Sequence, residues 1–206
     1  MRLAPLLLAM GLGLAACAPT PPTTTTPPDQ GVYGARTDSG PNGEPIEIHA
    51  VRSAYLTESN RRQRVAYNGS EAPGTIVVDP SNYYVYRIEG DGNATRYGAN
   101  VGREGFLWSG DAYVGRKAEW PIWTPPKEMI KRQPEAAKYA GGMPPGLDNP
   151  LGARTLYLYQ NNRYTLYTIY STSDPETIGN GITSGCTGLL TQDLSLIHIS
   201  EPTRPY

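Results

Sequence analysis

Short runs of β-branched and aromatic residues, separated by turn residues, dominate the middle of the chain. Residues 75–79 form an apolar run, Pro80-Ser81-Asn82 interrupts it, and residues 83–88 mix aromatic with aliphatic side chains. A turn cluster at residues 89–93 allows residues 94–97 to pair back antiparallel. The pattern therefore predicts a series of short adjacent strands joined by hairpins.

A second hairpin is predicted further along, where residues 155–159 and 164–170 flank the polar residues 160–163. Between the two hairpins a short helix could begin at Pro126, because proline is tolerated in a first helical turn. Residues 141–152 contain too much glycine and proline for a regular element. A loop of that length in a compact domain is usually functional, and the alternative is a mobile excursion without a role.

Composition supports a mostly β domain and excludes several classes of function. The 206 residues include 23 glycines and 20 prolines, and 15 tyrosines against one phenylalanine, which favours short strands and turns over long helices. A net charge of −1 means that the chain lacks the excess of positive charge typical of a nucleic-acid-binding protein, so we expect no DNA or RNA partner. Two cysteines, two histidines and no Walker or dinucleotide motif predict neither a metal nor a cofactor.

The first thirty residues are typical of an export signal followed by a tether. Residues 1–16 combine one arginine with a short apolar run, too short for a stable transmembrane helix. Leu14-Ala15-Ala16-Cys17 resembles the bacterial lipobox, which implies cleavage before Cys17 and lipidation of that residue; ordinary secretion is the alternative. The lipobox pattern with Ala18 implies a periplasmic lipoprotein of the outer membrane. Residues 17–30 are then a stiff Pro/Thr linker, and 31–72 a partly ordered lead-in.

Cys186 is the only thiol of the mature domain and so cannot form an intrachain disulfide. It lies in Thr183-Ser184-Gly185-Cys186-Thr187-Gly188, where flanking glycines would let backbone N–H groups of Ser184 and Gly185 approach a substrate carbonyl as an oxyanion hole. The alternative is a small buried apolar side chain. Local residues alone do not choose between the two.

Several blocks of the chain resemble the catalytic domain of the L,D-transpeptidase (YkuD) family. The matching blocks are residues 73–79, 96–98, 101–106, 116–121, 143–154, 177–179 and 184–186. The resemblance implies a mostly β sandwich with short helices and a long Pro/Gly-rich loop, spanning residues 73–193. It also implies a cysteine nucleophile that takes the acyl group of a peptidoglycan stem peptide at diaminopimelate and passes it to an amine.

Carried over onto this sequence, the family pattern makes Cys186 the nucleophile. It implies substrate-binding roles for Met143, Pro144, Gly146, Asn149, Ser171 and Thr172. Two positions depart from the pattern. The family histidine of a His-Gly-Thr triplet is Tyr170 here, in Tyr170-Ser171-Thr172, and the arginine two positions after the cysteine is Gly188.

These departures leave two hypotheses for the function. A free thiol with pKa about 8.5 is mostly protonated at pH 7, and a phenol with pKa about 10 is no ordinary base there. Tyr170 could still orient Cys186 or donate a hydrogen bond to an intermediate. The chain is then either an L,D-transpeptidase in cell-wall cross-linking or remodelling, or a catalytically impaired peptidoglycan-binding lipoprotein; a structural spacer leaves Cys186 unexplained. The acceptor amine stays open: a stem peptide, a D-amino acid or a protein.

Residues 194–206 resemble the in-frame translation of a transposase sequencing adapter. We therefore expect the authentic sequence to break off at about Asp193, which leaves the domain without its closing strand and exposes a sheet edge. On this interpretation His198 has no catalytic role.

Overall fold

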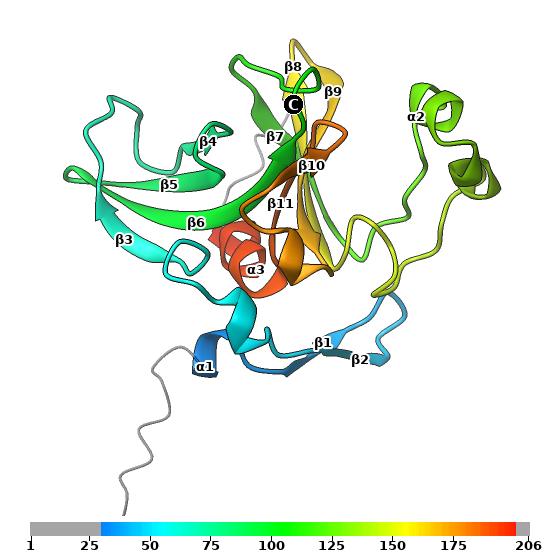
Figure 1. Cartoon of the computed structure of the whole chain (residues 1–206), viewed down its shortest axis with the longest axis horizontal. Coiled ribbons are helices and arrows are strands. Elements are labelled where there is room, and N and C mark those ends of the chain that lie inside the picture. Colours follow the sequence, from blue (N-terminus) through cyan, green and yellow to red (C-terminus); the bar gives the residue numbers. More distant parts are fainter. Residues whose placement is uncertain (1–29, 201–206) are drawn as a thin grey trace, which may run out of the picture.

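The computed structural model describes residues 30–200, and the side chains of residues 31–198, as a mostly β fold with short helices (Figure 1). A sheet with the order β4-β5-β6-β11-β9-β8-β7 curls around the core, and β3 and β10 also pair with β6. The strands of this sheet are β3 (Gln63–Ala66), β4 (Ile76–Asp79), β5 (Tyr84–Gly90), β6 (Asn93–Gly102), β7 (Tyr113–Glu119), β8 (Arg154–Gln160), β9 (Arg163–Thr172), β10 (Gly181–Thr183) and β11 (Thr187–Leu190). The mostly β fold predicted from the sequence is confirmed.

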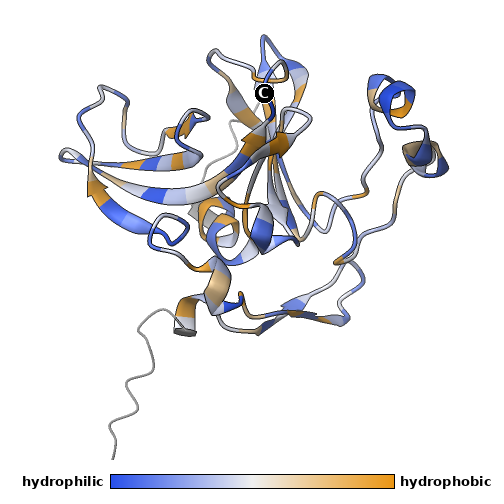
Figure 2. Ribbon diagram, viewed as in Figure 1, coloured by the Kyte–Doolittle hydropathy of each residue, from blue (hydrophilic) through white to orange (hydrophobic). Residues whose placement is uncertain are grey.

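The other elements are short. They are α1 (Gln30–Tyr33), β1 (Arg36–Ser39), β2 (Pro45–Ile48), α2 (Lys127–Arg132), α3 (Thr191–Ser200) and the 3-10 turns at Ser53–Tyr55, Pro134–Tyr139 and Pro175–Thr177. Apolar side chains from both curved halves of the sheet meet α3 in one core, with Val85, Leu156 and Leu189 fully buried. Figure 2 shows apolar residues on α3 and, alternating with polar ones, along the strands next to it.

Both predicted hairpins form. β4 pairs antiparallel with β5 and β5 with β6, and β8 pairs antiparallel with β9. The second hairpin turns at Asn161 and Asn162, both with positive φ, a conformation that asparagine tolerates better than most residues. The short helix predicted at Pro126 is α2, which begins one residue later with Pro126 as its N-cap.

Residues 31–72 contain more regular structure than the partly ordered lead-in that we expected. They form α1, the β1–β2 hairpin and β3, which pairs antiparallel with β6. Tyr33, Val51 and Leu56 bury their side chains in a second apolar cluster with Ile178 and Leu190. Hydrophobic periodicity is weak in this segment. Single apolar side chains spaced irregularly along the chain, rather than a regular alternation of apolar and polar residues, pack it against the domain.

Residues 1–29 and 201–206 lie outside the described residues, and with them the expected signal segment 1–16, Cys17 and nearly all of the linker. Among the residues that are described, no helix combines the length and apolarity needed to span a membrane.

Residues 194–198 lie within α3, where Leu194 and Ile197 are fully buried and the Lys117 ammonium donates to the His198 carbonyl oxygen at 2.7 Å. This packing requires apolar side chains at two positions three residues apart, a condition that many sequences meet. The adapter origin of residues 194–206 therefore stays a prediction.

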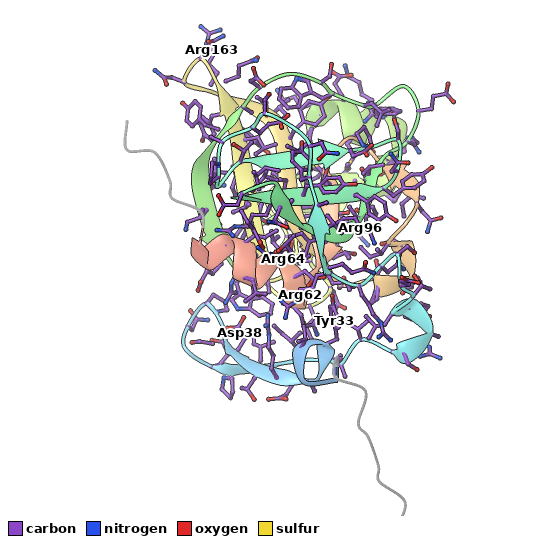
Figure 3. The ribbon with its side chains drawn as sticks, turned by 90° about the vertical axis from the view of Figure 1, so that its left-hand side faces the viewer. Tyr33, Asp38, Arg62, Arg64, Arg96 and Arg163 are labelled. Carbon is purple, nitrogen blue, oxygen red and sulfur yellow. The ribbon has the colours of Figure 1, made fainter. Side chains whose placement is uncertain are left out.

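A buried carboxylate joins residues 31–72 to the domain. Asp193 is fully buried at the start of α3, and the Tyr33 hydroxyl donates to it at 3.2 Å. The Arg62 guanidinium approaches only to 4.0 Å; Figure 3 shows Tyr33 and Arg62 next to each other. Because burial outweighs these contacts, the pKa of Asp193 rises from 3.8 to about 7.

This raised pKa predicts a pH-dependent stability. Between about pH 4 and 7 the folded chain binds more protons than the unfolded chain, so the contribution of Asp193 to stability is largest below pH 4 and is lost as pH rises to 7. We expect Asp193→Asn to stabilise the protein more at pH 8 than at pH 5. The change in the free energy of unfolding should be more favourable at pH 8 by on the order of 2 kcal/mol. Urea unfolding at both pH values measures this difference. Asp111→Asn, at an exposed site, is the control, and an equal change at both pH values would contradict the prediction.

Candidate active site

A groove of about 760 Å³ runs along the outer face of β9 and is lined by Cys186. Its other walls come from the arm that carries α2, between β7 and β8, and from the segment around β10. In Figure 1 this arm stands apart from the sheet on the side of β9. Segments distant in sequence therefore meet at one thiol.

Cys186 lies between β10 and β11 and is half-buried. β11 pairs with β6 on one side and β9 on the other, so the backbone next to Cys186 is held from both sides. The thiol lies 3.9 Å from the carbonyl oxygen of Leu166, to which it can donate a weak hydrogen bond. The nucleophile predicted from sequence thus stands on a rigid part of the sheet and faces a groove.

A bulge in β9 turns the Leu166 carbonyl toward this thiol. Tyr157 pairs with Thr168 and Tyr159 with Tyr164, so residues 165–167 stand opposite Leu158 alone. Leu166 has φ +70°, uncommon for a branched side chain, and its side chain is 62% exposed in the groove. Strained backbone of this kind concentrates at functional sites. The regular alternation of residues 164–170 contains no signal for this bulge.

The residues before Cys186 form a tight loop. Gly185 has φ +119°, and a Cβ there would lie 2.6 Å from the Tyr167 ring, so only glycine fits. The Gly185 N–H donates to the Thr183 hydroxyl at 3.2 Å and is thus occupied within the loop. Ser184 lines the groove. The oxyanion role of these two residues stays a prediction, whereas the need for glycine is explained by packing.

Tyr170, at the position of the family histidine, also faces the groove. Its hydroxyl donates to Asn100 Oδ1 at 3.3 Å, and the Asn100 amide donates to the Thr177 hydroxyl at 2.7 Å. Burial, and then the proximity of Cys186, raise the pKa of Tyr170 to about 12. At neutral pH this phenol is protonated, so it cannot accept the proton of the thiol.

Gly188 explains how Tyr170 and Asn100 can meet. Gly188 pairs with Asn100 on β6 and with Tyr170 on β9, so the three lie in one row across adjacent strands. A Cβ at Gly188 would come within 2.3 Å of Asn100 Oδ1. The two positions that depart from the family pattern therefore both lie against Asn100. Sequence reasoning missed Asn100, because no motif singles it out and its partners lie far along the chain.

The Pro/Gly-rich loop contributes to the groove through Pro150 and Leu151. Met143, Pro144 and Gly146 do not belong to the groove lining, although Met143 forms an antiparallel bridge with Trp123, which does. Asn149 is fully buried, and its amide donates to the carbonyl oxygens of Pro121, Met143 and Pro144. Asn149 therefore shapes the loop from inside.

The two residues after Tyr170 differ in their surroundings. Ser171 is fully buried, and its hydroxyl accepts the Arg154 N–H at 2.9 Å. Thr172 lines the groove, and its hydroxyl accepts the Asp174 N–H at 3.0 Å. The structure thus places Thr172 at the groove and Ser171 beneath it.

No imidazole lines the groove. The chain has two histidines: His198 lies on α3, and the His49 carbonyl oxygen accepts a bond from Gln192 at the other side of the domain. Within the part of the chain that the structure describes, no three His, Cys, Asp or Glu side chains are arranged to hold a metal ion.

This chain is similar to a family profile and to several known proteins. The sequence profile of the L,D-transpeptidase catalytic domain (YkuD) matches residues 73–197. A protein of Fuscovulum blasticum named "Putative L,D-transpeptidase in ATP synthase subunits region ORF 5" is 37% identical over 76 residues, which are 37% of this chain and 36% of that protein. The match thus spans about a third of the length of this curated relative.

Another similarity is to a crystal structure from Brucella melitensis titled "Probable carnitine operon oxidoreductase caia". Its TM-score is 0.52 at 37% sequence identity, and the alignment covers 74% of this chain and 95% of that chain. The fold described above is therefore shared with a solved structure over most of both chains.

Proposed function

Because the chain belongs to the L,D-transpeptidase catalytic domain family, we propose that it transfers acyl groups of peptidoglycan stem peptides through Cys186. The observation that carries this proposal is the position of Cys186 directly before β11, a strand paired on both sides, where it lines a groove of about 760 Å³. A groove of this size is typical of a small-ligand or peptide site.

The proposed reaction has two steps. The thiolate of Cys186 attacks the diaminopimelate carbonyl, the C–N bond to the fourth residue breaks, and the released amine takes up a proton. The thioester is then attacked by an acceptor amine, which forms a new amide, and the thiol is restored. The acceptor belongs to another stem peptide, a D-amino acid or a protein.

Tyr170 does not supply the base for this reaction, because burial and Cys186 keep its pKa near 12 and its hydroxyl donates to Asn100. The thiol must therefore lose its proton to solvent. General base catalysis typically contributes 10²–10⁴-fold, so we expect slow turnover at neutral pH.

A second function, peptide binding without turnover, is favoured by the same geometry around Tyr170. On this second function the groove still binds a peptide, but Cys186 forms no covalent bond with it. For either function we propose a lipid anchor at Cys17 that holds the domain in the periplasm, at the outer membrane, close to peptidoglycan.

The pH dependence of product formation tests the proposed function. We expect cross-linked or exchanged muropeptides from a tetrapeptide substrate, at a rate that still rises with pH above pH 7, because a thiol attacks as its thiolate and no side chain of the groove takes its proton. Mass spectrometry of the products measures the rate, and intact-protein mass detects the thioester. A rate already level at pH 7 would contradict the absence of a base, and no product or adduct at any pH, with peptide binding intact, would favour the binding function.

A further inference from the structure

A row of side chains leads across the sheet from Cys186 to a cation. In the parallel pairing of β11 with β9, Thr187 lies opposite Ile169, so Cys186 lies one step before it, opposite Thr168. Thr168 pairs with Tyr157 on β8, and Tyr157 pairs with Arg116 on β7. All four residues line the groove, and strand pairing puts them in one row along its floor.

The Arg116 guanidinium lies over the Tyr157 ring, with its central carbon 3.7 Å from the ring centroid. Because the guanidinium lies over Tyr157 on β8, its charge is about one strand closer to Cys186 than the Arg116 backbone on β7 is. Strands in a sheet are about 4.8 Å apart, so the guanidinium stands roughly two strand spacings, about 10 Å, from Cys186. No carboxylate among the described residues pairs with Arg116. Its charge is thus available to a ligand.

Thr168, between Cys186 and Tyr157, carries a buried hydroxyl that needs a partner. Its side chain is 3% exposed, and Thr168 Oγ1 makes no hydrogen bond to any described residue. An unsatisfied buried hydroxyl costs about 1–3 kcal/mol, so such groups are rare unless a ligand or water completes them. The orphaned hydroxyl at the groove floor therefore points to a polar ligand group.

Neither carboxylate of the groove belongs to this row of side chains. Glu128 on α2 pairs with Lys131 at 2.7 Å, and Asp174 follows the end of β9, well beyond Thr168 along the strand. The second lining cation, Arg132, lies over Phe106 on the arm side, 4.9 Å from the ring centroid. The floor between Cys186 and Arg116 thus presents donors and a positive charge, which suits an anion.

We propose that Arg116 and Thr168 bind a carboxylate of the substrate, carried on a side chain that extends from the carbonyl attacked by Cys186 toward the guanidinium, which stands about 10 Å from the thiol. This proposal rests on the proposed function, and it explains which substrates the proposed acyl transfer would select. A guanidinium and a hydroxyl match a carboxylate in charge and in donors. A diamino diacid residue meets the condition, because its side chain ends in a carboxylate several bonds from its reacting carbonyl.

Equilibrium binding tests this subsite separately from turnover. The full chain with Cys186→Ala is titrated by calorimetry with two tetrapeptides that differ only in the side-chain carboxylate of the third residue, free in one and amidated in the other. We expect the free carboxylate to bind at least about tenfold more tightly, and Arg116→Gln to remove this preference while leaving the affinity for the amidated peptide unchanged. Thr168→Val, of nearly equal shape, is expected to reduce the preference by less.

Arg163→Gln is the matched control, since Arg163 lies at the exposed tip of the β8–β9 hairpin and points away from the domain (Figure 3). Equal binding of both peptides to the parent protein, binding of neither, or an equal loss for both peptides in Arg116→Gln overturns the subsite. The proposed acyl transfer is tested separately, by looking for the thioester adduct in the protein that retains Cys186. A thioester with no carboxylate preference would overturn the subsite alone.

Discussion

Replacing Cys186 by alanine is expected to reduce product formation by at least about 10³-fold and to abolish the thioester adduct, because the covalent route needs the sulfur atom. The fold should tolerate the change. The thiol is half-buried and its one hydrogen bond, to the Leu166 carbonyl oxygen, is long at 3.9 Å. Intact-protein mass spectrometry and muropeptide analysis measure the two losses.

Peptide binding separates loss of chemistry from loss of structure in this variant. We expect the dissociation constant of the tetrapeptide for Cys186→Ala to stay within about twofold of the wild-type value, because the groove keeps its other walls. Unchanged product formation in Cys186→Ala would show that the thiol is not the nucleophile. A wild-type protein that binds equally well but never forms an adduct would favour the binding function.

Tyr170→His is expected to increase the rate at pH 7 by roughly 10²-fold and to move the rising part of the pH profile toward lower pH. An imidazole with pKa about 6.5 can accept the thiol proton at neutral pH, which the tyrosine with pKa about 12 cannot. Asn100 Oδ1 accepts the Tyr170 hydroxyl at 3.3 Å, and in the variant we expect the Asn100 side chain to turn toward the shorter imidazole and accept its N–H. Such an arrangement would give the Cys-His-Asn order of groups found in other cysteine enzymes.

Two further variants test the reasoning behind this gain. Tyr170→Phe removes the hydroxyl and supplies no base, so its rate and pH profile should stay within a few-fold of the wild type. Combining Tyr170→His with Asn100→Ala should lose most of the gain, because nothing then orients the ring. A Tyr170→His rate no higher than wild type, or a large loss in Tyr170→Phe, would show that Tyr170 acts in another way. Steady-state rates from pH 5 to 9 distinguish these outcomes.

The hairpins could be predicted because their signals are local. Alternation of apolar residues, turn residues at 89–93 and 160–163, and proline at 126 each act within a few residues. Cys186 became the candidate nucleophile through the family resemblance, because the residues around it also fit a small buried apolar side chain. Residues 31–72 lack such patterns, since their stability comes from separate contacts such as Tyr33 with Asp193.

The surroundings of the thiol could not be predicted in the same way. Leu166 reads as an ordinary strand residue, and its left-handed conformation follows only from how β8 and β9 pair. Asn149 and Ser171 occupy positions of the family motif. Both are buried, and their side chains bond to backbone groups rather than entering the groove.

By itself the sequence determined the class of this protein: a mostly β chain with a family motif around one cysteine and a tyrosine in place of the motif histidine. Only the tertiary structure decided what that tyrosine does, because Asn100, Gly188 and Tyr170 become neighbours through strand pairing. It also decided that Arg116 faces the same groove as the thiol. The reason is physical: hydrogen bonding between strands and burial of one sheet face act across the chain, whereas propensity and turn chemistry act along it.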